Sequence, residues 1–192
     1  TDLPEVMDFV WDTLSGALAD GQHPWRLPAI GTVEDGQARL RTIVLRQVDR
    51  SGRRLSCYAD QRSAKMAELG APPRMSWLFY DPVGQYQLRA HGRVVMADEA
   101  ERRRVWATLP LFARKPYAAG KLPGTPIDEA HDGLPQGFMD RSLAETDTYF
   151  QYFAILHTVV DELDWLQLDH TAHVRARYHW RDGQWRGSWI IP

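Results

Sequence analysis

Turn signals divide much of this sequence into short segments, and their spacing constrains the fold most strongly. The turns are expected at Asp35-Gly36, 49–52, 81–84 and 181–184. Pairs such as Asp-Gly favour the tight turns of β-hairpins. The expected strands are 27–33, 39–48, 55–58, 75–80, 86–96, 153–160, 163–168, 173–180 and 185–191. Many antiparallel strands with a few helices favour a closed β-barrel with helical additions.

A first helix is expected over residues 2–20, because Asp2 and Glu5 form a capping-box pattern ahead of apolar residues at helical spacing. Further helices are expected over 64–69, over 98–109, and briefly after Ser142 and Glu145. Residues 110–140 are rich in Pro and Gly and predict a long loop. Since no linker or repeat interrupts the chain, residues 1–192 are expected to form a single domain.

Composition excludes several functional classes. The 192 residues are 44% hydrophobic and 25% charged, as in a globular protein with a core. A net charge of −2 gives no overall attraction to nucleic acid or to anionic membranes. One cysteine, Cys57, and seven scattered histidines predict neither a disulfide nor a metal site. An acidic, amphipathic N-terminus and the lack of a long apolar run predict a cytoplasmic protein.

A cationic cluster is the main chemical feature. The sequence contains no GxSxG, P-loop, HExxH or GxGxxG motif. Arg41 and Arg46 lie on one expected strand, and Ser63 and Lys65 open the short helix that follows the next strand. A helix N-terminus, a guanidinium fork and an ammonium group all suit a phosphate. Taken singly, each residue fits a surface charge or a helix cap better than an anion site, and both interpretations stay open.

Five blocks between about residues 25 and 97 resemble the pyridoxamine 5'-phosphate oxidase-like FMN-binding proteins in both order and spacing. The blocks are RTIVLR, CYAD, RSAKMAEL, WLFY and YQLRAHGRV. The resemblance implies a split β-barrel that forms a homodimer, with FMN held at the subunit interface. Arg41 matches the family's FMN-phosphate arginine, and Ser63 and Lys65 match its phosphate-binding serine and lysine. Ile43 and Val44 lie where backbone groups meet the flavin ring.

Other positions extend the implied FMN site. Tyr58 and Ala59 match a tyrosine-threonine pair on the flavin, with a small residue in place of threonine. Gln87 matches a glutamine that reaches FMN from the other subunit. Near the C-terminus, Trp165 resembles the flavin-side tryptophan and Arg177 resembles the last FMN-contacting arginine.

The substrate positions depart from the family pattern. The resemblance makes Arg46, Arg114, His173 and Arg175 the candidates for substrate contact. The Arg-x-His-x-Arg motif of the oxidases appears as His173-Val-Arg175-Ala-Arg177, with the first two residue types exchanged. Capture of the phosphate of pyridoxamine 5'-phosphate is therefore in doubt. No residue stands out as an essential acid or base.

The expected function is that of an FMN-dependent oxidoreductase, in which a hydride passes from a small substrate to FMN. Fold similarity does not settle the reaction. A flavin reductase on the same fold and a non-catalytic flavin- or haem-binding protein are the alternatives. The sequence indicates neither the substrate nor the electron acceptor.

Overall fold

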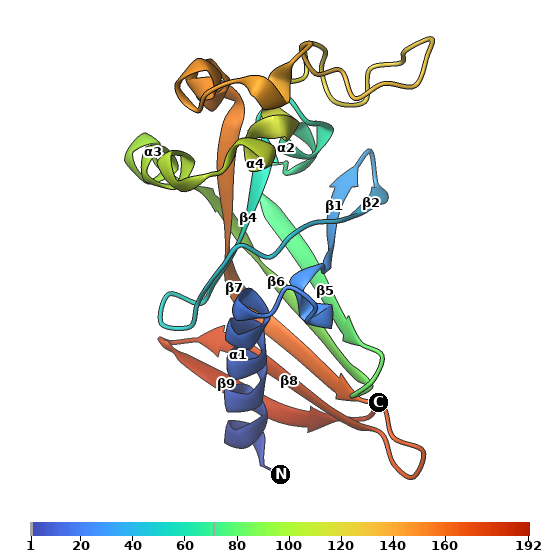
Figure 1. Ribbon diagram of the computed structural model, residues 1–192. Helices are drawn as coiled ribbons and strands as arrows, with labels where there is room; N and C mark the ends of the chain where they lie inside the picture. The colour runs from blue at the N-terminus through green and yellow to red at the C-terminus, as the bar shows by residue number, and fades with distance from the viewer. Residues whose placement is uncertain (1, 71) are drawn as a thin grey trace. The chain divides into compact units, whose positions relative to one another are not determined.

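The computed structural model describes residues 2–70 and 72–192, which divide into two compact units (Figure 1). The first unit comprises the described residues of 1–57, 69–95 and 157–192, and the second comprises 58–68 and 96–156. Three strands run from one unit into the other: β4 (Arg54–Asp60), β6 (Tyr86–Met96) and β7 (Phe153–Gln167). The single domain expected over 1–192 stays a prediction.

The strands form one sheet in the order β2-β1-β5-β6-β7-β4-β3, which continues from β7 through β8 to β9. The remaining strands are β1 (Ala29–Glu34), β2 (Gln37–Thr42), β3 (Gln47–Asp49), β5 (Arg74–Asp81), β8 (Val174–Arg181) and β9 (Gln184–Ile190). The pairs β1–β2, β5–β6 and β8–β9 are antiparallel neighbours in the chain. The expectation of a mostly β protein with helices is confirmed.

Two of the hairpin turns show why their sequences are informative. Asp35 and Gly36 have φ angles of 49° and 77°, and Asp182 and Gly183 have φ angles of 52° and 75°. Two successive residues with positive φ match the twist of the flanking strands, and Asp-Gly tolerates this conformation well. These turns were therefore predictable from local sequence alone.

The single strand expected over 39–48 is wrong, because β2 ends at Thr42 and β3 begins only at Gln47. Between them, the Ile43 N–H donates to the Pro28 carbonyl and the Leu45 N–H donates to the Arg26 carbonyl, each at 3.0 Å. Leu45 is fully buried. Contacts with residues far back in the chain, together with the burial of Leu45, interrupt the strand.

The two strands expected over 153–160 and 163–168 are in fact one continuous strand, β7. The polar residues Asp161 and Glu162 lie between the two expected segments. Asp161 forms an ion pair with Arg74 at 2.7 Å, and the ladder with β8 begins at Glu162. Their partners on neighbouring strands make polar residues compatible with an uninterrupted strand.

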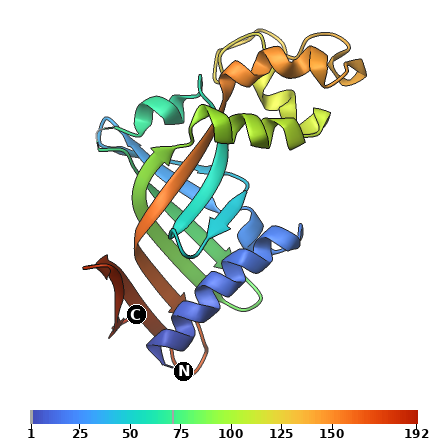
Figure 2. The same cartoon turned by 90° about the vertical axis from the view of Figure 1, so that its left-hand side faces the viewer.

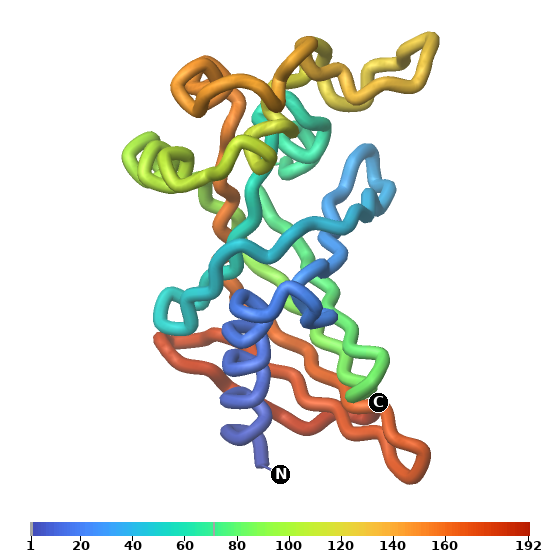
Figure 3. The backbone as a smooth tube through the Cα atoms, in the orientation of Figure 1, coloured from blue at the N-terminus to red at the C-terminus, as the bar shows by residue number. Residues whose placement is uncertain are grey.

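Helix α1 (Leu3–Ala19) covers part of the core of the first unit (Figure 3). Its predicted capping box is present, since the Glu5 N–H donates to Asp2 Oδ1 and the Asp2 N–H donates to Glu5 Oε2, both at 2.9 Å. The buried face of α1 includes Val10, Trp11 and Leu14. Within residues 2–70 and 72–192, no helix is both long and apolar enough to cross a membrane.

The second unit contains most of the short helices (Figure 2). They are α2 (Ala64–Glu68), α3 (Glu99–Thr108), α4 (Leu111–Arg114), η2 (Lys115–Tyr117), η3 (Phe138–Asp140) and η4 (Ala144–Tyr152). Their core consists of Trp106, Leu109, Tyr117, Phe153 and Ile155. The loop expected over 110–140 is partly wrong, because α4, η2 and η3 occupy its ends and only 118–137 lacks helix and strand. Burial of Tyr117 and Phe138 draws these ends into helical turns.

Candidate cofactor and substrate site

Ser63 and Lys65 lie side by side at the start of α2, as expected for a phosphate-binding pair. Strand β4 ends at Asp60, and the Ser63 hydroxyl donates to the Asp60 carbonyl at 2.7 Å. The Lys65 ammonium donates to Ser63 Oγ at 3.2 Å. Both side chains are half-buried. A hydroxyl and an ammonium at this separation can bind neighbouring oxygens of one anion.

The basic residue just before this pair, Arg62, has a different role. Its guanidinium pairs with Asp60 at 2.7 Å and stacks over the Tyr152 ring at 3.8 Å. It also donates to the carbonyls of Tyr117 and Ala119. The hydrogen bonds with Asp60 raise the pKa of Arg62 above its ordinary value, against the opposing effect of burial. Arg62 therefore holds the turn before α2 against the rest of the second unit.

Tyr58 and Ala59, the predicted flavin-facing pair, lie on the part of β4 that belongs to the second unit. Tyr58 is half-buried and packs edge-on against Phe153, with ring centroids 5.1 Å apart. Ala59 is buried. The tyrosine ring is thus fixed by an aromatic neighbour, which is a suitable support for a flat ligand.

Arg41 belongs to the first unit, and Ser63 and Lys65 belong to the second. Arg41 lies on β2 opposite Ile30 of β1, and its guanidinium donates to Thr32 Oγ1 and, at 3.2 Å, to the Arg39 carbonyl. These bonds hold the guanidinium along the β1–β2 hairpin.

The next predicted ring contacts, Ile43 and Val44, are half-buried in the interruption between β2 and β3. Arg46 follows them, with its backbone N–H donating to the Ser56 carbonyl at 2.9 Å and its side chain half-buried. Gln87 is half-buried on β6, where it pairs with Tyr80 of β5.

Trp165 lies in an aromatic cluster of the first unit. Its ring stacks on Tyr86 at 6.0 Å between centroids and meets Phe9 of α1 at 6.4 Å. The Trp165 indole N–H is buried without a hydrogen-bond partner among the described residues. A pocket of about 240 Å³ lies here, lined by Glu5, Val6, Phe9, Tyr86, Trp165 and Gln167. The cluster offers flat apolar walls together with one unused donor.

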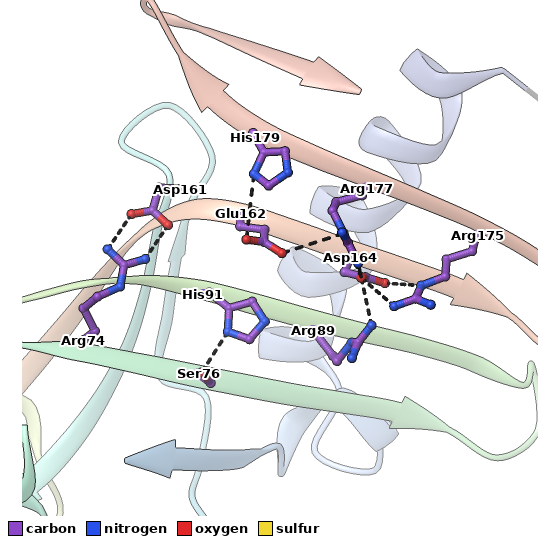
Figure 4. A network of polar contacts seen from close by, with 10 residues as sticks. All are labelled: Arg74, Ser76, Arg89, His91, Asp161, Glu162, Asp164, Arg175, Arg177 and His179. Atoms are coloured by element: carbon purple, nitrogen blue, oxygen red, sulfur yellow. Dashed lines mark hydrogen bonds and ion pairs between the residues drawn. The ribbon is translucent and has the colours of Figure 1, made fainter. Parts of the chain in front are cut away.

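Three arginines converge on the buried carboxylate of Asp164 (Figure 4). Asp164 lies on β7 with 2% of its side chain exposed. Arg175 of β8 binds it through Nε and Nη2, both at 2.9 Å. Arg177 of β8 donates to Asp164 Oδ2 at 3.1 Å, and Arg89 of β6 donates to the same oxygen at 2.8 Å. Two predicted site residues, Arg175 and Arg177, are thereby brought together.

Burial of Asp164 opposes its ionisation, but hydrogen bonds from Arg175 and Arg89 outweigh burial and lower the pKa of this carboxyl. The bond to Asp164 likewise raises the pKa of the Arg175 guanidinium. Asp164 is therefore ionised throughout the neutral range. Its role was missed from the sequence. Glu162 and Asp164 lie two residues apart on one strand face, opposite His179 and Arg177 of β8, and this spacing is the signal that could have indicated it.

Arg114 and His173 lie elsewhere. Arg114 is buried in the second unit, where its guanidinium donates to the Leu143 and Trp106 carbonyls, to Thr146 Oγ1 and to Asp147 at 2.8–3.0 Å. This geometry gives Arg114 a structural role. His173 is exposed just before β8 and accepts a hydrogen bond from the Asp169 N–H at 3.2 Å. Their predicted contacts with substrate stay predictions.

Comparison with curated proteins finds distant relatives with one shared description. A pyridoxine/pyridoxamine 5'-phosphate oxidase from Pseudomonas putida (strain W619) is 24% identical, covering 96% of this chain and 95% of that protein. One from Pseudomonas paraeruginosa (strain DSM 24068 / PA7) is also 24% identical, over 85% of this chain and 76% of that protein.

Solved structures share the fold. A pyridoxamine 5'-phosphate oxidase-related, FMN-binding protein from Nostoc punctiforme PCC 73102 matches with a TM-score of 0.76 and 24% identity, covering 94% of this chain and 96% of that one. PhzG from Burkholderia lata 383, in complex with tetrahydrophenazine-1-carboxylic acid, matches with a TM-score of 0.74 and 17% identity, over 97% and 92% of the two chains. The fold predicted from the family resemblance is confirmed.

A family model described as "Pyridoxamine 5'-phosphate oxidase, FMN-binding domain" matches residues 9–98. This range contains all five sequence blocks that carry the resemblance, together with Arg41, Ser63, Lys65 and Gln87. The resemblance to the pyridoxamine 5'-phosphate oxidase FMN-binding domain family is therefore confirmed over residues 9–98 of this chain.

Proposed function

We propose that this protein binds FMN and acts as an FMN-dependent oxidoreductase related to pyridoxamine 5'-phosphate oxidase. The observation that carries the proposal is the contact between Ser63 and Lys65 inside the range that matches the FMN-binding family. When bound, FMN would supply the redox chemistry by accepting a hydride from a small substrate. The protein would bind and orient both molecules and exclude water.

The donor chemistry of these residues fits the FMN phosphate. A phosphate monoester carries close to two negative charges near pH 7 and has three strong acceptor oxygens. Lys65 and Arg41 supply positive charge, and the Ser63 hydroxyl becomes a further donor when it turns from the Asp60 carbonyl to the phosphate. Burial of Ala59 and the edge-on packing of Tyr58 are consistent with a flat ring near β4. The contact between Ser63 and Lys65 supports their assignment to the phosphate, and the family resemblance alone adds Arg41.

The remaining cofactor contacts are proposals carried by the family resemblance. Ile43, Val44, Tyr58 and Ala59 would support the ring, with Trp165 and Arg177 contributing from β7 and β8. Arg46, His173 and Arg175 would face the substrate. The internal bonds of Arg114 favour a supporting role over direct contact for that residue.

We also propose a homodimer in which Gln87 of one subunit reaches FMN bound by the other. Exposed apolar side chains support this assembly, because β5 presents Leu78 and Tyr80 with 41% and 46% of their surface exposed. Tyr80 pairs directly with Gln87 across the β5–β6 ladder. A second subunit would cover these side chains and complete the site. A cytoplasmic location stays a prediction.

Steady-state turnover tests the enzymatic part of the proposal. FMN-loaded protein is assayed with a panel of amines and alcohols for hydrogen peroxide release, and with reduced nicotinamides for flavin reduction. Turnover of an amine or alcohol supports an oxidase. Turnover of nicotinamides alone would indicate a flavin reductase. Tight FMN binding with no turnover across the panel would indicate a non-catalytic flavin-binding protein.

A further inference from the structure

The hydrogen bonds at Asp164 are unbalanced. Its two oxygens accept five N–H contacts from three guanidiniums, at 2.8–3.3 Å. A carboxylate offers about four lone-pair sites, whereas each guanidinium carries about five N–H donors. The Asp164 carboxylate can therefore accept no further hydrogen bonds, whereas the three guanidiniums still have N–H groups that could donate. Nε of Arg89 illustrates the surplus, since it is buried with no hydrogen-bond partner among the described residues.

The charges are unbalanced in the same direction. Around Asp164, three guanidiniums face two carboxylates, because Glu162 also approaches Arg177 at 3.9 Å. His179 approaches Glu162 at 3.8 Å and adds no negative charge. Nearby Arg74 is already neutralised by a two-point ion pair with Asp161 (Figure 4). At least one positive charge of the cluster is thus left without a counter-charge in this network.

Exposure shows where an external anion could bind. The Asp164 side chain is 2% exposed, whereas those of Arg89 and Arg177 are each 38% exposed and that of Arg175 is 19% exposed. The carboxylate lies beneath, and the guanidiniums extend from it toward solvent. Asp164 also accepts a bidentate pair of hydrogen bonds from Arg175. Arginine commonly recognises carboxylate and phosphate groups through this bidentate geometry.

We propose that Asp164 is a specificity-determining residue: a built-in counter-anion that occupies the Arg89–Arg175–Arg177 site and excludes substrate phosphate or carboxylate groups from it. The cluster is then an anion site filled by the protein's own side chain. The claim that this is an anion site stands without the proposed function. The claim that the excluded anions are groups of a substrate rests on the proposed function. With Asp164 in place, the preferred substrate is a small molecule without a phosphate at this position.

Phosphate binding to the flavin-free protein tests the proposal directly. Isothermal titration calorimetry with inorganic phosphate compares wild type, Asp164→Asn and Asp161→Asn, each also carrying Lys65→Ala to weaken the site proposed for the FMN phosphate. Asp164→Asn should bind phosphate about tenfold more tightly than wild type or more, because it frees a two-point guanidinium contact. Adding Arg175→Gln to Asp164→Asn should abolish that gain. Asp161→Asn, which breaks an exposed pair with a single arginine, should change the affinity less than about twofold.

Unpairing three guanidiniums could unfold Asp164→Asn, so a second variant keeps the test decisive. Asp164→Asn combined with Arg89→Gln removes one carboxylate and one guanidinium, which preserves the local net charge. It should still bind phosphate more tightly than wild type does. Equal phosphate affinity in this double variant and wild type would overturn the proposal. Since flavin is absent throughout, a failure to bind FMN would leave this result intact.

Discussion

Replacing Lys65 with Ala should weaken FMN binding strongly while leaving riboflavin binding nearly unchanged. Lys65 is half-buried, and its ammonium lies 3.2 Å from Ser63 Oγ, so both groups can meet one phosphate. A hydrogen bond that involves a charged group contributes about 1.5–3 kcal/mol, which corresponds to roughly ten- to a hundredfold in affinity. Riboflavin lacks the phosphate and should lose less than about twofold. Arg41→Ala should show the same pattern.

The assay is fluorescence titration of the flavin-free protein with FMN and with riboflavin. Lys121→Ala is the matched control, since Lys121 is exposed in the segment that lacks helix and strand. It should leave both affinities unchanged. Equal losses of FMN and riboflavin affinity in Lys65→Ala would refute the reasoning, because they would mean that Lys65 supports the fold and not the phosphate.

Three other predictions concern assembly, substrate and stability. Light scattering should report about twice the chain mass of 22.1 kDa, and a monomer that binds FMN tightly would contradict the shared site and the role of Gln87. Pyridoxamine 5'-phosphate should be a poor substrate or none, because His173 and Arg175 stand in exchanged places; turnover of about 0.1–1 per second in a hydrogen peroxide assay would contradict this. Arg114→Met should destabilise the fold by about 3 kcal/mol in denaturant unfolding, because it leaves buried acceptors unpaired, whereas exposed Arg103→Met should cost less than about 0.5 kcal/mol.

Local signals in the sequence were sufficient for several elements. The capping box of α1 and the Asp35-Gly36 turn depend on residues within a few positions of each other. The bounds expected for β6 match those observed, because turn residues at 81–84 mark its start. By contrast, the interruption after Thr42 depends on bonds to Pro28 and Arg26, which no local pattern reveals.

In the candidate site, too, local sequence indicates some contacts, whereas others depend on residues far apart in the chain. The contact between Ser63 and Lys65 was predictable because the two residues lie two positions apart in a block that resembles a known family. Asp164 was missed because its partners lie 11, 13 and 75 residues away, on two other strands. Arg114 is a related case: its four acceptors come from segments up to 33 residues away, and only the folded unit shows that they occupy both terminal nitrogens of the guanidinium.

The most direct test of FMN binding is to identify the ligand of the purified protein by absorbance and mass spectrometry. We expect the mass of FMN and flavin absorption at about 450 nm, either as purified or after flavin-free protein is mixed with FMN. Preference for FAD, a deazaflavin or haem, or failure to bind FMN at high micromolar concentration, would contradict it.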